Sequence, residues 1–194
     1  MPISVERHRD LWLKNGLTDA PVSVNVPRRA WRKYFPAETE RLVKTTLFTA
    51  SKISIESLKN LASSFPASPE NNHDLFVATM MWGRGPKNGR MMPKFQVAAS
   101  HREFDKTLSN TRESVMQGDL KGAYSQWLSS GIRGIREPFF TKWLFVCGLR
   151  NDPGILQAFT LDGRVRASLR TLEWPDAPLK KFSGVNRHCF MRHT

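Results

Sequence analysis

The chain of 194 residues contains only two cysteines, Cys147 and Cys189. Two cysteines so far apart provide neither the ligand spacing of a zinc site nor a disulfide framework, and an iron–sulfur cluster needs four. The five histidines are also scattered and form no metal-binding pattern. The sequence therefore predicts no metal centre and no cofactor.

Long hydrophobic runs are missing as well. No stretch of 18 apolar residues is present, so we expect no segment that spans a membrane. The N-terminal residues MPISVERHRD lack the apolar core of a signal peptide, which favours a cytoplasmic protein. The GxxxxGK[ST] spacing of a phosphate-binding loop and the motifs of serine and cysteine hydrolases are absent too.

Acidic residues are scarce relative to basic ones. The chain has 17 Asp and Glu against 30 Lys and Arg, which gives a net charge of +13 and a pI of about 10.4. A charge of this size and sign predicts a polyanionic partner, most simply nucleic acid, with an anionic membrane surface as the lesser alternative. Hydrophobic residues make up 40% of the chain and permit a substantial core.

No sustained two-residue alternation, internal repeat or low-complexity tract occurs, and we predict an all-α fold. Ser54 should cap a helix that includes Leu61, and the turn formers SSFPASPENN should follow it as a loop. We expect one helical domain over 1–194, with an N-terminal part at about 1–70, a hairpin and catalytic part at about 71–172, and a basic tail at 173–194. The other helices are expected at 4–15, 37–50, 73–82, 101–117, 119–130, from Pro138 onward, and after Asp162.

Two basic stretches are candidates for contact with nucleic acid. The segment PRRAWRKYFP, residues 27–36, interleaves basic and aromatic side chains. It predicts either contacts with a DNA backbone or a surface helix whose aromatic residues dock on the core. The segment GRGPKNGRMMP, residues 83–93, is rich in glycine and basic residues, so it predicts either a lip of a DNA groove or a plain connection.

A glycine turn, GIRGIR at residues 131–136, lies between two expected helices. Helix, glycine turn and helix is the arrangement in which backbone N–H groups are presented to a phosphate. We expect the two isoleucines to anchor the turn from beneath. The predicted backbone contacts are Gly131, Ile132, Arg133, Gly134 and Ile135.

Lys142 lies in the middle of the aromatic helix that follows this turn. Pro138 suits the first turn of that helix. A lysine in apolar surroundings either extends its stem to water or is held for a purpose, and burial would lower its pKa. Twenty residues later, Asp162 precedes another amphipathic run, where it acts either as a helix cap or as a functional carboxylate that stays charged.

This glycine turn with its Lys142 and Asp162 pair resembles the helix-hairpin-helix DNA glycosylase superfamily. More narrowly, FFTKWLF…LDGRV is similar to the small bacterial proteins with the 8-oxoguanine DNA glycosylase fold. The resemblance implies two helical lobes around a DNA groove, a lysine nucleophile, Lys142, that attacks the sugar C1′, and an assisting carboxylate, Asp162. The chain departs from the commoner hairpin in that residues 135–141 separate the second glycine from the lysine.

A glycosylase of this kind must take its target base out of the stack, which implies a pocket and a wedge side chain. Trp82 is a candidate pocket wall, although a tryptophan at this place also fits a core position. The tentative base pocket is Trp82, Phe140 and Trp143. The predicted groove contacts outside the hairpin are Arg84, Lys87 and Arg90, and the wedge candidates are Arg84, Arg90, Met91 and Phe95.

We therefore expect a monomeric DNA glycosylase that acts on double-stranded DNA, with 8-oxoguanine as the favoured base and with possible abasic-site lyase activity. Hypermodified bases of phage DNA are the alternative substrate, in which case the enzyme would serve antiviral defence. From a different class, a non-catalytic protein could use the hairpin only as a phosphate clamp. An RNA-binding protein is the third interpretation, and the missing aromatic RNP signature disfavours it.

Overall fold

The computed structural model describes residues 23–45, 52–84, 91–149, 158 and 160. This part of the chain is helical apart from one short antiparallel strand pair, in which Val24 pairs with Ile53. The all-α prediction is confirmed. The elements are β1 (Val24–Asn25), α2 (Arg28–Arg32), α3 (Pro36–Lys44), β2 (Lys52–Ile53), α4 (Ile55–Ser64), α5 (Pro69–Arg84), α6 (Met92–Ala99), α7 (Phe104–Met116), α8 (Leu120–Ser129) and α9 (Glu137–Cys147).

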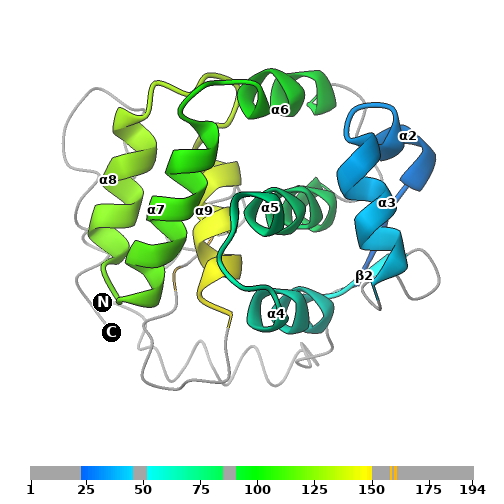
Figure 1. Cartoon of the computed structure of the whole chain (residues 1–194), viewed down its shortest axis with the longest axis horizontal. Coiled ribbons are helices and arrows are strands. Elements are labelled where there is room, and N and C mark those ends of the chain that lie inside the picture. Colours follow the sequence, from blue (N-terminus) through cyan, green and yellow to red (C-terminus); the bar gives the residue numbers. More distant parts are fainter. Residues whose placement is uncertain (1–22, 46–51, 85–90, 150–157, 159, 161–194) are drawn as a thin grey trace, which may run out of the picture.

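Helix α5 lies at the centre of the described helices, with α3, α4, α6, α7 and α9 arranged around it (Figure 1). Every residue from Asp74 to Met81 is buried, so this stretch of the helix has no solvent-facing side. A helix that is buried all round belongs to the interior of a protein. The remaining elements are therefore placed by their packing on α5.

Aromatic contacts join α5 to three neighbouring helices. The ring of Phe76 on α5 meets Phe95 of α6 at 6.5 Å, Phe104 of α7 at 5.1 Å and Trp143 of α9 at 6.1 Å between ring centroids. All three pairs are edge-to-face, the arrangement that aromatic quadrupoles favour. These contacts fix α6 and α9, which carry the candidate site, relative to the core.

A buried arginine links α4, α5 and α7. Arg112 of α7 donates to the side-chain oxygen of Asn72 at 2.7 Å and to the backbone oxygens of Ala62 and Phe65 at 3.1 and 2.7 Å. The two carbonyls belong to the C-terminal end of α4, where helical carbonyls lack partners within the helix. The guanidinium thus closes the end of one helix while holding it against two others.

Some boundaries differ from those expected. Helix α5 begins at Pro69, inside the stretch expected to be a loop, because Ser68 caps it by accepting a hydrogen bond from the Asn71 N–H at 3.2 Å. Helix α6 was not expected at all. The described helix within 37–50 ends at Lys44, and its Val43 is exposed.

The cap at Ser54 is confirmed, since its hydroxyl accepts from the Ser57 N–H at 3.0 Å. In the basic segment at 27–36, Trp31 and Phe35 are buried, as the interpretation of a helix docking its aromatics on the core requires. The helices expected at 4–15 and after Asp162 lie outside the described residues. The subdivision of the chain into three parts stays a prediction.

A histidine bridges three helices of this core. His73 of α5 lies between Glu38 of α3, at 3.6 Å, and Asp105 of α7, at 2.5 Å. Burial alone would lower the pKa of His73, but the hydrogen bond to Glu38 and the charge of Asp105 outweigh it and raise that pKa above its ordinary 6.5. The hydrogen bond with His73 in turn lowers the pKa of Glu38 below 4.5.

These shifts predict a pH dependence of stability. The raised pKa of His73 means that its contribution is complete below pH 6.5 and is lost as the pH rises through the raised value. The contribution of Glu38 is present above pH 4.5 and is lost in acid. We expect His73→Gln to lower the free energy of unfolding by about 1 kcal/mol at pH 6 and by clearly less at pH 8.5, as measured by urea unfolding. Equal losses at both pH values, or the same pattern in the control His101→Gln, would contradict this origin.

Candidate functional site

The glycine turn at residues 131–136 connects α8 to α9 (Figure 1). Gly131 and Gly134 have φ angles of 71° and 96°, a region that side-chain-bearing residues rarely adopt. Ile135 is buried and Ile132 packs partly against the core, so both isoleucines hold the turn from beneath. Arg133 is exposed at its tip. The turn is therefore a rigid connection with a basic outer side.

The turn is also pressed against α6. A Cβ atom at Gly134 would lie 2.7 Å from the backbone oxygen of Lys94. Cβ atoms in proteins essentially never approach another atom this closely. No side chain fits between the two backbones. Gly134 thus has two reasons to be glycine, its φ angle and this close approach.

An open hollow of about 620 Å³ lies where the turn meets α6. Lys94, Arg133 and Arg136 give it three positive charges, and none of its described lining residues is acidic. Val97 is 68% exposed and adds an apolar patch beside the charges. We call this surface the hairpin hollow. Its lining residues are Met91, Pro93, Lys94, Val97, Arg133, Gly134, Arg136 and Phe139.

Lys142 lies close to the hairpin hollow but inside the protein. Only 8% of the residue is exposed, and its Nζ is 6.0 Å from the centroid of the Phe139 ring, which itself lines the hollow. Its stem runs over Gly83 at the end of α5, where a Cβ atom would lie 2.6 Å from the lysine Cδ. Next to Gly83, Trp82 stacks on Phe145 of α9 at 6.1 Å. The fold thus brings Gly83 of α5, with Trp82 next to it, into contact with Lys142 of α9.

The family comparison bears on this arrangement. The model of the family described as "Putative 8-oxoguanine DNA glycosylase OGG-like protein" matches residues 20–189. The chain belongs to this family. Searches of the curated proteins and of the solved structures gave no significant match. The predicted resemblance to the helix-hairpin-helix glycosylases is confirmed, and family membership implies a DNA glycosylase with DNA as its substrate.

Two of the expected pocket residues lie in the core of this OGG-like protein. Phe140 is 3% exposed and stacks on Trp127 at 5.7 Å, and Trp143 is fully buried with its indole N–H donating to Thr111 at 3.0 Å. Neither ring can stack on a base without leaving these contacts, so we omit both from the proposed pocket. Trp82 is only partly buried and stays a candidate.

The other predicted residues divide in a similar way. Phe95 is fully buried against Trp31 at 6.4 Å, which argues against a role as a wedge, whereas Met91 lines the hairpin hollow and keeps that possibility. Lys87, Arg90, Asp162 and the side chain of Arg84 lie outside the described residues.

Sequence reasoning missed part of the hairpin hollow. Lys94 and Val97 belong to helix α6, which was not predicted, and Arg136 directly follows the five predicted hairpin contacts at 131–135. A usable signal was present for α6, because Pro93 occupies its first turn as Pro138 does in α9.

None of the described helices is both long and apolar enough to cross a membrane.

The two hairpin glycines offer a matched pair of variants. Gly131→Ala meets no atom within 4 Å, so it should cost only about 1–2 kcal/mol for its positive φ. Gly134→Ala has the same backbone strain and also collides with the Lys94 carbonyl, so the turn must move away from α6. We expect Gly134→Ala to lose more stability in urea unfolding and more affinity for duplex DNA than Gly131→Ala. Equal effects of the two changes would show that contact with α6 does not shape the hairpin.

Proposed function

We propose that this chain excises an oxidised base of the 8-oxoguanine type from double-stranded DNA as a monomer, with Lys142 as the nucleophile and Asp162 as the carboxylate that assists it. The observation that carries the proposal is the position of Lys142. It is a buried lysine on the helix that follows the glycine hairpin, and its Nζ lies near the ring of Phe139, which lines the basic hairpin hollow. Lysine side chains are seldom buried to this extent.

The hairpin hollow supplies the phosphate contacts in this proposal. Arg133 and Arg136 attract the DNA backbone, and the glycines let it approach the main chain closely. Base contacts are made after the target nucleotide has left the stack. Trp82, which is only partly buried and precedes Gly83, is the proposed wall of the base pocket.

The chemistry needs Lys142 as a neutral amine. Its Nζ attacks C1′ of the flipped nucleotide, the bond from C1′ to the base breaks, and the base leaves with the bonding electrons and takes up a proton. The positive charge that develops on the sugar is stabilised by the carboxylate of Asp162. Loss of a proton from Nζ and opening of the sugar ring give a Schiff base. Removal of a C2′ proton then expels the 3′ phosphate, which is the lyase step.

Borohydride trapping tests the nucleophile, because it reduces a Schiff base to a stable amine. We expect a covalent adduct with duplexes that carry 8-oxoguanine, no adduct with Lys142→Gln, and a drop in base removal of about a thousandfold or more in that variant. The control Lys121→Gln changes an exposed lysine of α8 and should behave like the parent.

The choice of duplexes decides between substrates. The panel should contain 8-oxoguanine, uracil, alkylated bases and modified cytosines in otherwise identical strands. An adduct that forms only with modified cytosines would show that the substrate is a hypermodified base and not an oxidised one. Tight, salt-dependent binding with no adduct and no base release on any duplex would instead support the non-catalytic clamp.

Gly83 provides a test of how Lys142 is positioned. An alanine Cβ would lie 2.6 Å from the lysine Cδ, so the stem must shift even though the α5 backbone can accept alanine. We expect Gly83→Ala to slow base removal by roughly tenfold to a hundredfold, with DNA affinity and thermal stability close to those of the parent.

A double-mutant cycle is the control for this effect. If Gly83 acts only through Lys142, the change Gly83→Ala should make no further difference to activity in a Lys142→Gln background. A further loss of activity in that background would give Gly83 a separate role, such as contact with the base.

A further inference from the structure

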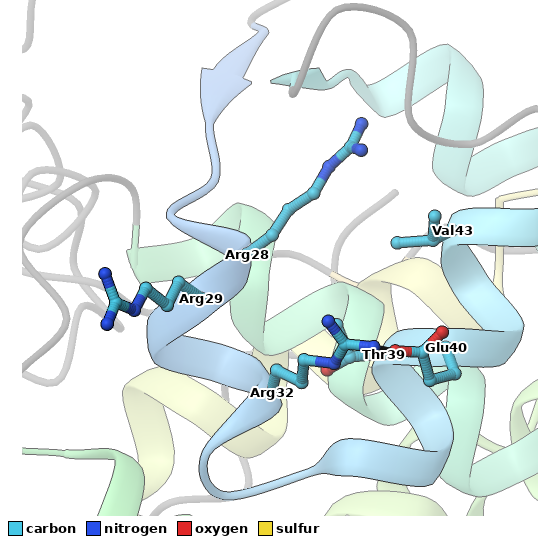
Figure 2. A pocket seen from close by; sticks show the side chains of 6 residues that line it. All are labelled: Arg28, Arg29, Arg32, Thr39, Glu40 and Val43. Atoms are coloured by element: carbon cyan, nitrogen blue, oxygen red, sulfur yellow. Dashed lines mark ion pairs between the residues drawn. The ribbon is translucent and has the colours of Figure 1, made fainter.

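A second basic hollow, of about 490 Å³, lies between α2 and α3 (Figure 2). We call it the α2–α3 hollow. Arg28 and Arg32 extend from α2 toward α3, while Arg29 extends to the other side of α2 in this view. The residues that line it are Arg28, Arg29, Arg32, Thr39, Glu40 and Val43.

The charge of this hollow is positive but not uniform. Its described lining residues include three arginines and one glutamate, which leave a net charge of +2. Glu40 pairs with Arg32 across the hollow, as the dashed line in Figure 2 shows, and both side chains stay about half exposed or more. Guanidinium groups therefore outnumber carboxylates among the described lining residues. The hollow is therefore suited to an anion that several N–H donors can bind together.

A buried hydroxyl in the wall gives an independent indication of a ligand. Thr39 is 2% exposed, and its Oγ1 has no hydrogen-bond partner among the described residues. A threonine within a helix usually donates to a carbonyl one turn earlier, as Thr111 does to Thr107 at 2.6 Å. Leaving a buried hydroxyl unsatisfied costs about 1–3 kcal/mol. An oxygen of a bound ligand would supply the missing partner.

Contacts of α6 connect this hollow to the hairpin. Trp31 of α2 stacks on Phe95 of α6, and the side chain of Gln96 donates to the Tyr34 carbonyl at 3.4 Å. Helix α6 in turn contacts the hairpin through Lys94 and Gly134. In Figure 1, α6 spans the distance between α2 and the hairpin end of α8.

We propose that the α2–α3 hollow binds a backbone phosphate of DNA, as a second contact separate from the hairpin hollow. Arg28 and Arg32 neutralise the phosphate, and the Thr39 hydroxyl donates to one of its oxygens. The choice of DNA rests on the proposed function, because family membership implies DNA as the substrate. Contacts of this kind position a protein on DNA without reading its sequence.

The test measures binding to an undamaged duplex at several salt concentrations, so that no catalysis is involved. Each phosphate that the protein neutralises contributes about 0.9 to the slope of log affinity against log salt. We expect Arg28→Gln and Arg32→Gln each to weaken binding several-fold and together to reduce that slope by about 1. Arg102→Gln is the matched control, since this arginine is exposed and does not line either described hollow.

Two further variants separate ligand binding from a structural role. Glu40→Gln removes the negative charge of the hollow and should strengthen DNA binding, which a merely disrupted helix pair would not do. Thr39→Val removes the unpaired hydroxyl at nearly constant shape, so the free protein should become more stable while its DNA affinity falls.

The proposal is overturned if the arginine variants match Arg102→Gln in affinity and slope, or if Thr39→Val leaves DNA binding unchanged. Weaker binding of inorganic phosphate with unchanged DNA binding would assign the hollow to a free anion, and would also overturn it. If the protein removes no base but its variants show the expected changes in DNA affinity and salt dependence, the proposed function is wrong and the second phosphate contact is still supported.

Discussion

The packing of α9 on α5 is the constraint on which the rest of the structure depends. Both helices are largely buried, and the contact of Phe76 with Trp143 sets their distance in the core. At the end of α5 the same packing brings Gly83 under the stem of Lys142. A reactive group held on a packed helix is placed more accurately than one on a loop. The core therefore determines the position of the proposed nucleophile.

Close backbone contact recurs on the binding side of the molecule. Gly134 meets the Lys94 carbonyl and Gly83 meets the lysine stem, so at both places the missing side chain is what permits the contact. Helix α6, which carries Lys94, contacts α2 through its aromatic and amide side chains. A change in the hairpin, in α6 or in α2 should therefore affect the other two, through the close approach of Gly134 to the Lys94 carbonyl and through the side-chain contacts between α6 and α2.

The sequence predicted the helical class, the glycine turn and the helix that carries Lys142, because glycine, proline and aromatic residues gave strong local signals there. It did not predict which side of α9 faces the core. A helix that is apolar nearly all round has no periodicity to orient it, so the sequence cannot distinguish a core position from a pocket position for Phe140 and Trp143. Helix α6 was missed because its Pro93 was attributed to the preceding glycine-rich segment. The partners of Arg112 and His73 are 32 to 50 residues away along the chain and leave no local pattern.

The distribution of charge also follows from the core rather than from composition. Trp31 and Phe35 of the segment at 27–36 are buried, which leaves Arg29 and Arg32 of α2 exposed. In the same way, burial of Ile135 turns Arg133 and Arg136 outward from the hairpin. Two basic hollows therefore arise from one physical cause, apolar anchors that alternate with cations in short segments. Because neutralised phosphates contribute in proportion to their number, the two proposed contacts together would give stronger and more salt-sensitive attachment to DNA than the hairpin alone.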